Sequence, residues 1–237
     1  MFPLYDNIPS RRTPWITYLL ILSCVAVYLF QLTLPHLGEG MAFRPGQVLT
    51  AKGLHQGPVV ILLAALSSVF MHGSWLHLLG NMWFLWIFGD NVEDRMGHVP
   101  YLAFYLICGM AATGAQVAVT ALGMDPHALG IPMVGASGAI AGVLGAYYRL
   151  FPKASVKSLI FIVFFITLVW IPATLFILLW FLMQLLLGLG SLGAGALGGV
   201  AFWAHVGGFL AGVILVGLFA PGRAAPPPPR VVEAKWE

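Results

Sequence analysis

The sequence predicts an all-α membrane protein, a polytopic bundle of six transmembrane helices. Of its 237 residues, 60% are hydrophobic and only 8% are charged, and the mean hydropathy is +0.93. Soluble domains carry about 25% charged residues, so most of this surface must face lipid. The 28 glycines agree, because Gly is commoner in transmembrane helices than in soluble ones.

Six apolar segments are the candidate spans, because a bilayer core of about 30 Å takes roughly 20 helical residues to cross. The fifth segment is longer than one span needs and Pro172 divides it, so its first part is expected at the interface or against the bundle. Residues 58–70 are apolar but too short to span, and are expected to be interfacial or partly embedded. The six segments are approximately 14–34, 74–88, 99–122, 137–148, 159–187 and 194–220.

These segments define a single membrane domain over residues 1–237, with its core at about 14–220. A short N-terminal segment precedes the core, and a Pro-rich tail, 221–237, follows it. The prolines of the tail favour an extended chain without a packed core.

The distribution of lysine and arginine predicts the orientation of the bundle. Six alternating spans with the N-terminus inside place two basic residues, Arg44 and Lys52, outside. Both termini are therefore predicted to be cytoplasmic. The cluster at residues 90–95 is predicted to be a solvated cap at the membrane boundary. The basic residues on the predicted inner side are Arg11, Arg12, Arg95, Arg149, Lys153, Lys157, Arg223, Arg230 and Lys235.

Three predicted spans carry polar side chains, which are costly in lipid and usually functional. His77 and Asn81 are four residues apart on the second span and share a face. Ser137 opens the fourth span, and His205 lies in the sixth. At 1.5 Å per residue from the predicted cytoplasmic ends, Ser137, His205 and His77 stand at roughly 18, 22 and 20 Å. The sequence therefore predicts that three helices bring these groups to one level.

Their chemistry points to acyl transfer. A serine hydroxyl becomes a nucleophile when a neighbouring base takes its proton, and His205 is the candidate base for Ser137. His77, Asn81 and the Ser137 backbone N–H are candidate donors to a developing oxyanion. No carboxylate lies within the three predicted spans, which indicates a Ser-His dyad rather than a triad.

Glycines provide a way to bring the two helices together. Gly138 and Gly142 lie along the fourth span, and Gly208 and Gly212 form a G-x-x-x-G pattern on the sixth. Small residues at this spacing let helix backbones approach closely. If the two faces meet, the serine and histidine come within hydrogen-bond reach.

Three motifs resemble those of the rhomboid intramembrane proteases of the simple six-helix prokaryotic type. They occur in the family's order, on the second, fourth and sixth spans, and the resemblance covers nearly the whole chain. The motifs are His72-x4-His77-x3-Asn81, Gly135-Ala136-Ser137-Gly138 and Ala204-His205-x-x-Gly208.

The resemblance implies a serine endopeptidase that cleaves peptide bonds within or next to transmembrane segments of membrane proteins. It implies Ser137 as nucleophile, His205 as general base, His77 and Asn81 as the oxyanion hole, and His72 near the mouth of a water-filled cavity. It implies no metal, nucleotide or other cofactor and no nucleic-acid partner. The expected location is a prokaryotic cell membrane, with the site opening to the outer side.

Two departures from the family pattern leave questions open. Residues 64–70 lack the Trp-Arg pair that some rhomboids carry before the histidine motif, so the anchoring of that loop is unexplained. Ala141 stands where some members place an aromatic ring against the catalytic histidine. How His205 is held is therefore also open.

Three other functions compete with proteolysis. A transporter with a polar pathway predicts inverted repeats, and none is evident. A non-proteolytic rhomboid-like binding factor is expected to lack the serine or the histidine, whereas both are present. A haem or metal site at His72 and His77 fits poorly, because residues five apart lie on poorly aligned helix faces.

Overall fold

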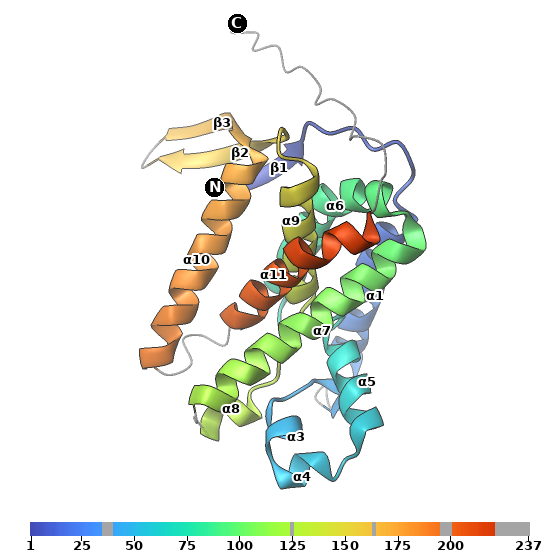
Figure 1. Ribbon diagram of the computed structural model, residues 1–237, viewed down its shortest axis with the longest axis vertical. Helices are drawn as coiled ribbons and strands as arrows, with labels where there is room; N and C mark the ends of the chain where they lie inside the picture. Colours follow the sequence, from blue (N-terminus) through green and yellow to red (C-terminus); the bar gives the residue numbers. More distant parts are fainter. Residues whose placement is uncertain (35–39, 124–125, 163–164, 195–200, 221–237) are drawn as a thin grey trace, which may run out of the picture.

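The computed structural model is a bundle of helices with a small β-sheet at one end (Figure 1). It describes residues 1–34, 40–123, 126–162, 165–194 and 201–220. The predicted Pro-rich tail and residues 195–200 of the sixth predicted span lie outside these ranges. In chain order the elements are β1 (Phe2–Asp6), α1 (Trp15–Thr33), α3 (Gly46–Leu49), α4 (Ala51–Leu54), α5 (Pro58–Ser68), α6 (Trp75–Met96), α7 (His98–Gly123), α8 (Pro126–Gly130), α9 (Ser137–Leu150), β2 (Ser155–Ile162), β3 (Phe165–Pro172), α10 (Ala173–Ala194) and α11 (Phe202–Phe219).

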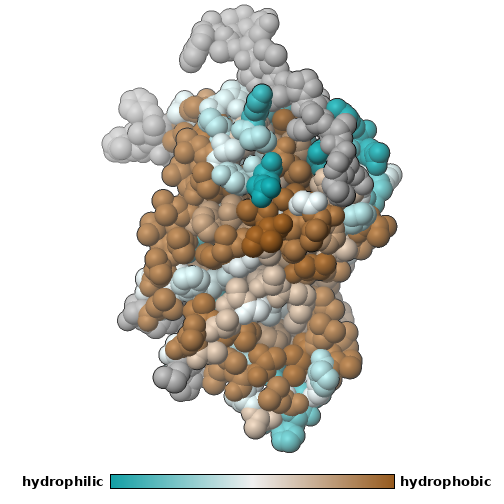
Figure 2. Space-filling model, viewed as in Figure 1, coloured by the Kyte–Doolittle hydropathy of each residue, from teal (hydrophilic) through white to brown (hydrophobic). Residues whose placement is uncertain are grey.

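The multi-pass membrane character is evident in the helices themselves. Four of them, α1, α7, α10 and α11, are long and apolar enough to cross a bilayer. Helix α6 ends in the charged segment 90–95, and α9 has only 14 residues. Figure 2 shows hydrophobic residues over most of the height of the bundle, with hydrophilic residues gathered toward its two ends.

Helix α9 is the centre of the bundle. Every residue from Gly138 to Tyr147 is buried, so this helix faces protein on all sides rather than lipid. Helices α6, α7, α10 and α11 all contact it (Figure 1). A helix buried all round does not need the continuous large apolar side chains of a lipid-facing span, which explains its small residues.

The prediction of an all-α protein is wrong for residues 2–6, 155–162 and 165–172. Strands β2 and β3 form an antiparallel hairpin, and β1 pairs antiparallel with the other edge of β2 to give the order β1-β2-β3. The long fifth segment therefore divides into a hairpin and a helix, and α10 begins directly after Pro172. Short apolar runs do not distinguish strand from helix by periodicity, although the many β-branched residues here favour strands.

Strand β1 is fixed to the helices through Asp6. The Asn91 side chain of α6 donates a hydrogen bond of 2.9 Å to Asp6 Oδ2, and the Tyr147 hydroxyl of α9 donates to the same oxygen. Burial raises the pKa of the Asp6 carboxyl to about 7, and the charge of Asp90 adds to the rise, while the Tyr147 hydrogen bond opposes it. These contacts join the sheet to two helices of the bundle.

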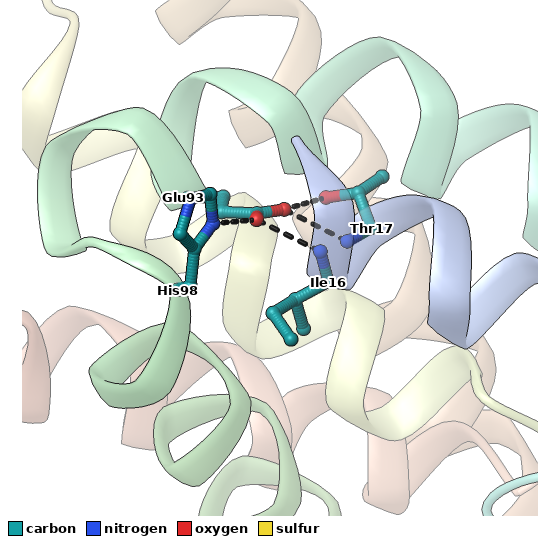
Figure 3. Close-up of polar contacts among 4 residues, drawn as sticks. All are labelled: Ile16, Thr17, Glu93 and His98. Carbon is teal, nitrogen blue, oxygen red and sulfur yellow. Dashed lines mark hydrogen bonds and ion pairs between the residues drawn. The ribbon is translucent and has the colours of Figure 1, made fainter. Parts of the chain in front are cut away.

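Helix α1 obtains its N-terminal cap from a different helix (Figure 3). Pro14 provides no side-chain cap, but Glu93 of α6 accepts hydrogen bonds from the Ile16 N–H at 2.9 Å and the Thr17 N–H at 2.7 Å. The Thr17 hydroxyl and His98 Nδ1 also bond this carboxylate, at 2.7 and 2.6 Å. Glu93 is only 1% exposed, so the prediction of a solvated cap is wrong for it. A carboxylate at a helix N-terminus satisfies otherwise unpaired N–H groups and complements the helix dipole.

Replacing Glu93 with alanine should destabilise the protein by about 2–4 kcal/mol, because the buried N–H of Thr17 and the half-buried N–H of Ile16 lose a charged acceptor. The measurement is thermal unfolding of the purified protein in detergent. Asp94→Ala, which removes the neighbouring and partly exposed carboxylate, is the control and should change the midpoint little. Equal midpoints for the two variants would contradict the capping role.

Candidate active site

The structure brings Ser137 and His205 together. Ser137 is the first residue of α9, and His205 lies in the first turn of α11. The Ser137 Oγ lies 2.8 Å from His205 Nε2, although the residues are 68 positions apart in the chain. This distance is within the range over which a general base takes a proton from its nucleophile.

The proximity of these two residues follows from glycines on both helices. A Cβ atom on Gly208 would lie 2.0 Å from the carbonyl oxygen of Gly138, and one on Gly212 would lie 2.0 Å from that of Gly142. A Cβ atom on Gly138 would also lie 2.5 Å from the Ala112 Cβ of α7. No side chain fits at these positions, so α9 and α11 pack backbone against backbone. The pattern is that of small residues at membrane helix interfaces.

His77 and Asn81 lie beside the chain that leads to the serine. Ser74 caps α6 by accepting a 3.2 Å hydrogen bond from the His77 N–H, which fixes the first turn. A Cβ atom on Gly135 would lie 2.7 Å from the His77 ring and 3.6 Å from Asn81 Nδ2. Gly135 has φ +125°, a conformation that favours glycine. Both side chains therefore reach the segment just before Ser137.

Asn81 has an unused donor. Its Nδ2 is buried and has no hydrogen-bond partner within the described part of the chain. Buried polar groups are nearly always paired, and an orphan needs an explanation. A donor kept free for a substrate oxygen is one such explanation.

His72 contacts the site through His77. It is 1% exposed, and its ring meets the His77 ring at a centroid distance of 5.1 Å. Its Nδ1 lies 3.2 Å from the Phe70 carbonyl oxygen, and Gln31 of α1 bonds its backbone N–H and carbonyl at 3.0 and 3.3 Å. Over the described ranges, no group of three His, Cys, Asp or Glu side chains is arranged to hold a metal ion.

Ser68, the last residue of α5, anchors the stretch 64–70, which lacks the Trp-Arg pair of some rhomboids. Its carbonyl oxygen accepts a 2.9 Å hydrogen bond from the Gly135 N–H, and its hydroxyl accepts one of 2.6 Å from the Phe43 N–H. Phe43 in turn accepts a 2.7 Å bond from the Met133 N–H. These bonds tie the first connection to the segment that precedes Ser137.

Sequence reasoning missed two residues that contact His205, and both come from α10. Gln184 Oε1 lies 2.7 Å from His205 Nδ1, and the Trp180 ring lies against the His205 ring at a centroid distance of 5.9 Å. Trp180 thus supplies an aromatic contact of the kind that Ala141 does not. The available signal was Gln184 itself, a polar residue in an otherwise apolar span.

The fold and the site define a class: a multi-pass helical membrane protein with a serine and a histidine paired between the first turns of two helices. Residues 62–222 match the family described as the Rhomboid domain, which is more than half of the chain. The chain belongs to the rhomboid family.

Individual relatives agree with this membership. The chain is 33% identical to RHOMBOID-like protein 4 of Arabidopsis thaliana over 151 residues, 63% of this chain and 32% of that protein. It is 31% identical over 108 residues to Rhomboid protein 1, mitochondrial, of Saccharomyces cerevisiae, 46% of this chain and 31% of the relative. Presenilin-associated rhomboid-like protein A, mitochondrial, of Danio rerio is 39% identical over 88 residues, 37% of this chain and 22% of the relative. The chain thus spans a third or less of the length of each of these relatives.

Gly212→Ala should lower the stability of the bundle by about 1–3 kcal/mol or more, because overpacking a tight contact forces the helices apart. Thermal unfolding in detergent measures the effect. Gly217→Ala on the same helix is the matched control, since a Cβ atom there meets nothing within 4 Å. Its midpoint should stay the same or rise slightly. If both variants unfold at the same temperature, the backbone contact does not limit stability.

Proposed function

We propose that this protein is an intramembrane serine endopeptidase that hydrolyses peptide bonds within or next to transmembrane segments of other membrane proteins. The observation that carries the proposal is the 2.8 Å contact between Ser137 Oγ and His205 Nε2. Membership of the rhomboid family supports it.

The residues suit a two-step acyl transfer. His205 Nε2 takes the Ser137 hydroxyl proton as Oγ attacks the scissile carbonyl carbon, and a tetrahedral oxyanion forms. His205 then gives that proton to the leaving nitrogen, the C–N bond breaks, and an acyl-serine remains. Water attacks the ester carbonyl carbon while His205 takes a proton from it, and His205 then gives that proton to Ser137 Oγ as the C–O bond breaks and the acid leaves.

The oxyanion requires donors that are in place before the reaction. The Asn81 Nδ2 is a free buried donor, and the Ser137 N–H stands at the N-terminus of α9, where the helix dipole favours negative charge. His77 lies against Gly135 on the same side. His72 contacts the His77 ring, and its proposed place is near the mouth of the cavity that supplies water to the site.

The proposed topology has six spans in one domain over residues 1–237, with α6 and α9 as the second and fourth. Both termini are cytoplasmic and the site opens to the outer side, as the lysine and arginine distribution predicts. Lipid and transmembrane protein substrates are the proposed partners. The predicted prokaryotic cell membrane is not supported by the relatives, several of which are named as mitochondrial.

A fluorophosphonate probe tests the Ser-His dyad in the purified full chain in detergent. The wild type should be labelled, and Ser137→Ala and His205→Ala should lose labelling by about 10³-fold or more. Ser191→Ala is the control, because Ser191 bonds only within α10 in the contacts seen, to the Gly188 carbonyl oxygen. Labelling of Ser137→Ala at the wild-type rate would contradict the proposed role of Ser137 as nucleophile. An unlabelled wild type would favour a non-proteolytic binding factor.

Asn81→Ala should lower turnover of a transmembrane substrate by about 10²-fold while leaving the melting temperature nearly unchanged, because Nδ2 has no partner to lose. Asn91→Ala on the same helix is the contrasting variant. It removes the 2.9 Å bond to Asp6, so it should lower the melting temperature and spare turnover. An unchanged rate in Asn81→Ala removes this residue from the oxyanion hole.

A further inference from the structure

Helix α10 holds the histidine from the side opposite the serine. Trp180 and Gln184 are four residues apart, so they lie on one face of α10, and both contact the His205 ring. Gln184 is 6% exposed, which leaves little room for water to replace it. Another face of α10 is exposed and apolar: its exposed residues include Leu175, Leu178, Leu179, Leu182 and Leu186.

The two hydrogen bonds of the His205 ring are compatible with one neutral tautomer. The Gln184 Oε1 only accepts, so the 2.7 Å contact requires a proton on His205 Nδ1. In a neutral ring Nε2 then carries the lone pair, and it lies 2.8 Å from Ser137 Oγ. The amide therefore selects the form of the imidazole that can accept the serine proton.

We propose that Gln184 is a positioning residue that fixes the tautomer and orientation of His205, in the place where a Ser-His-Asp site uses a carboxylate. The inference rests on the proposed protease function. The Trp180 ring restricts movement of the His205 ring on one side, and the hydrogen bond to Gln184 fixes the rotation of the His205 ring. Because both contacts come from α10, the orientation of the His205 ring depends on how α10 packs against α11 (Figure 1).

A neutral amide and a carboxylate differ at the moment of proton transfer. Once His205 holds two protons, its Nδ1–H still donates to Gln184, but the amide adds only a dipole. A carboxylate would add a full charge and stabilise the imidazolium. Exchange of Gln184 for glutamate therefore changes the pH dependence of the reaction, which a merely structural contact would not do. His77 also acts electrostatically on His205 and stays unchanged in this comparison.

The test is the fluorophosphonate labelling rate of the full chain in detergent as a function of pH. Gln184→Met keeps the side-chain length and removes the acceptor, so labelling should slow about tenfold, the value of one hydrogen bond in a rate. Gln184→Glu restores an acceptor, so its rate should return to within about threefold of wild type, and the acidic limb of its profile should move to higher pH. Met183→Leu, next to it and 48% exposed, is the matched control and should label normally.

Each other outcome has a distinct meaning. Gln184→Met labelling at the wild-type rate would overturn the positioning role and leave the dyad intact. Equal slowing in the Met and Glu variants with an unshifted pH profile would also overturn it, because the contact would then be only structural. A wild type that no serine probe labels removes the proposed protease function, and the positioning role with it.

Discussion

The arrangement of this site depends on the close approach of α9 and α11. In a bilayer no hydrophobic force drives one apolar helix onto another, so contact depends on packing and on the absence of side chains between backbones. Gly208 against Gly138, and Gly212 against Gly142, leave no space for even one Cβ atom. This spacing is what allows a short serine side chain to reach an imidazole on a separate helix. The rest of the bundle encloses that pair of helices.

Several polar side chains of the bundle bond to a residue in a different helix or strand. Glu93 caps α1 from α6, Gln184 holds His205 from α10, and Asn91 holds Asp6 of β1. In each case the two residues belong to different elements and lie at least 21 positions apart in the chain. Where lipid replaces water, a buried polar group needs a protein partner, so each such pair also specifies how the elements are placed.

Much of this could be predicted from the sequence, and the failures have physical causes. Counting residues from the predicted cytoplasmic helix ends predicted a common depth for Ser137 and His205, and the glycine spacing gave a reason for their helices to meet. The paired strands at 155–162 and 165–172 were missed because the periodicity of a short apolar run does not distinguish a strand from a helix. Gln184 was missed because its role exists only relative to His205, and no local pattern encodes that neighbour. The buried cap at Glu93 was missed for the same reason.

The pairing of β1 with β2 has a consequence for the order of assembly. Strand β1 precedes α1, α6, α7 and α9 in the chain, yet its partner strand β2, residues 155–162, follows all four of these helices. Strand β1 must therefore stay unpaired until β2 has been synthesised, and such a long-range pairing is intrinsically slow to form. Pairing of β1 with β2 therefore closes a long stretch of chain that contains α1, α6, α7 and α9.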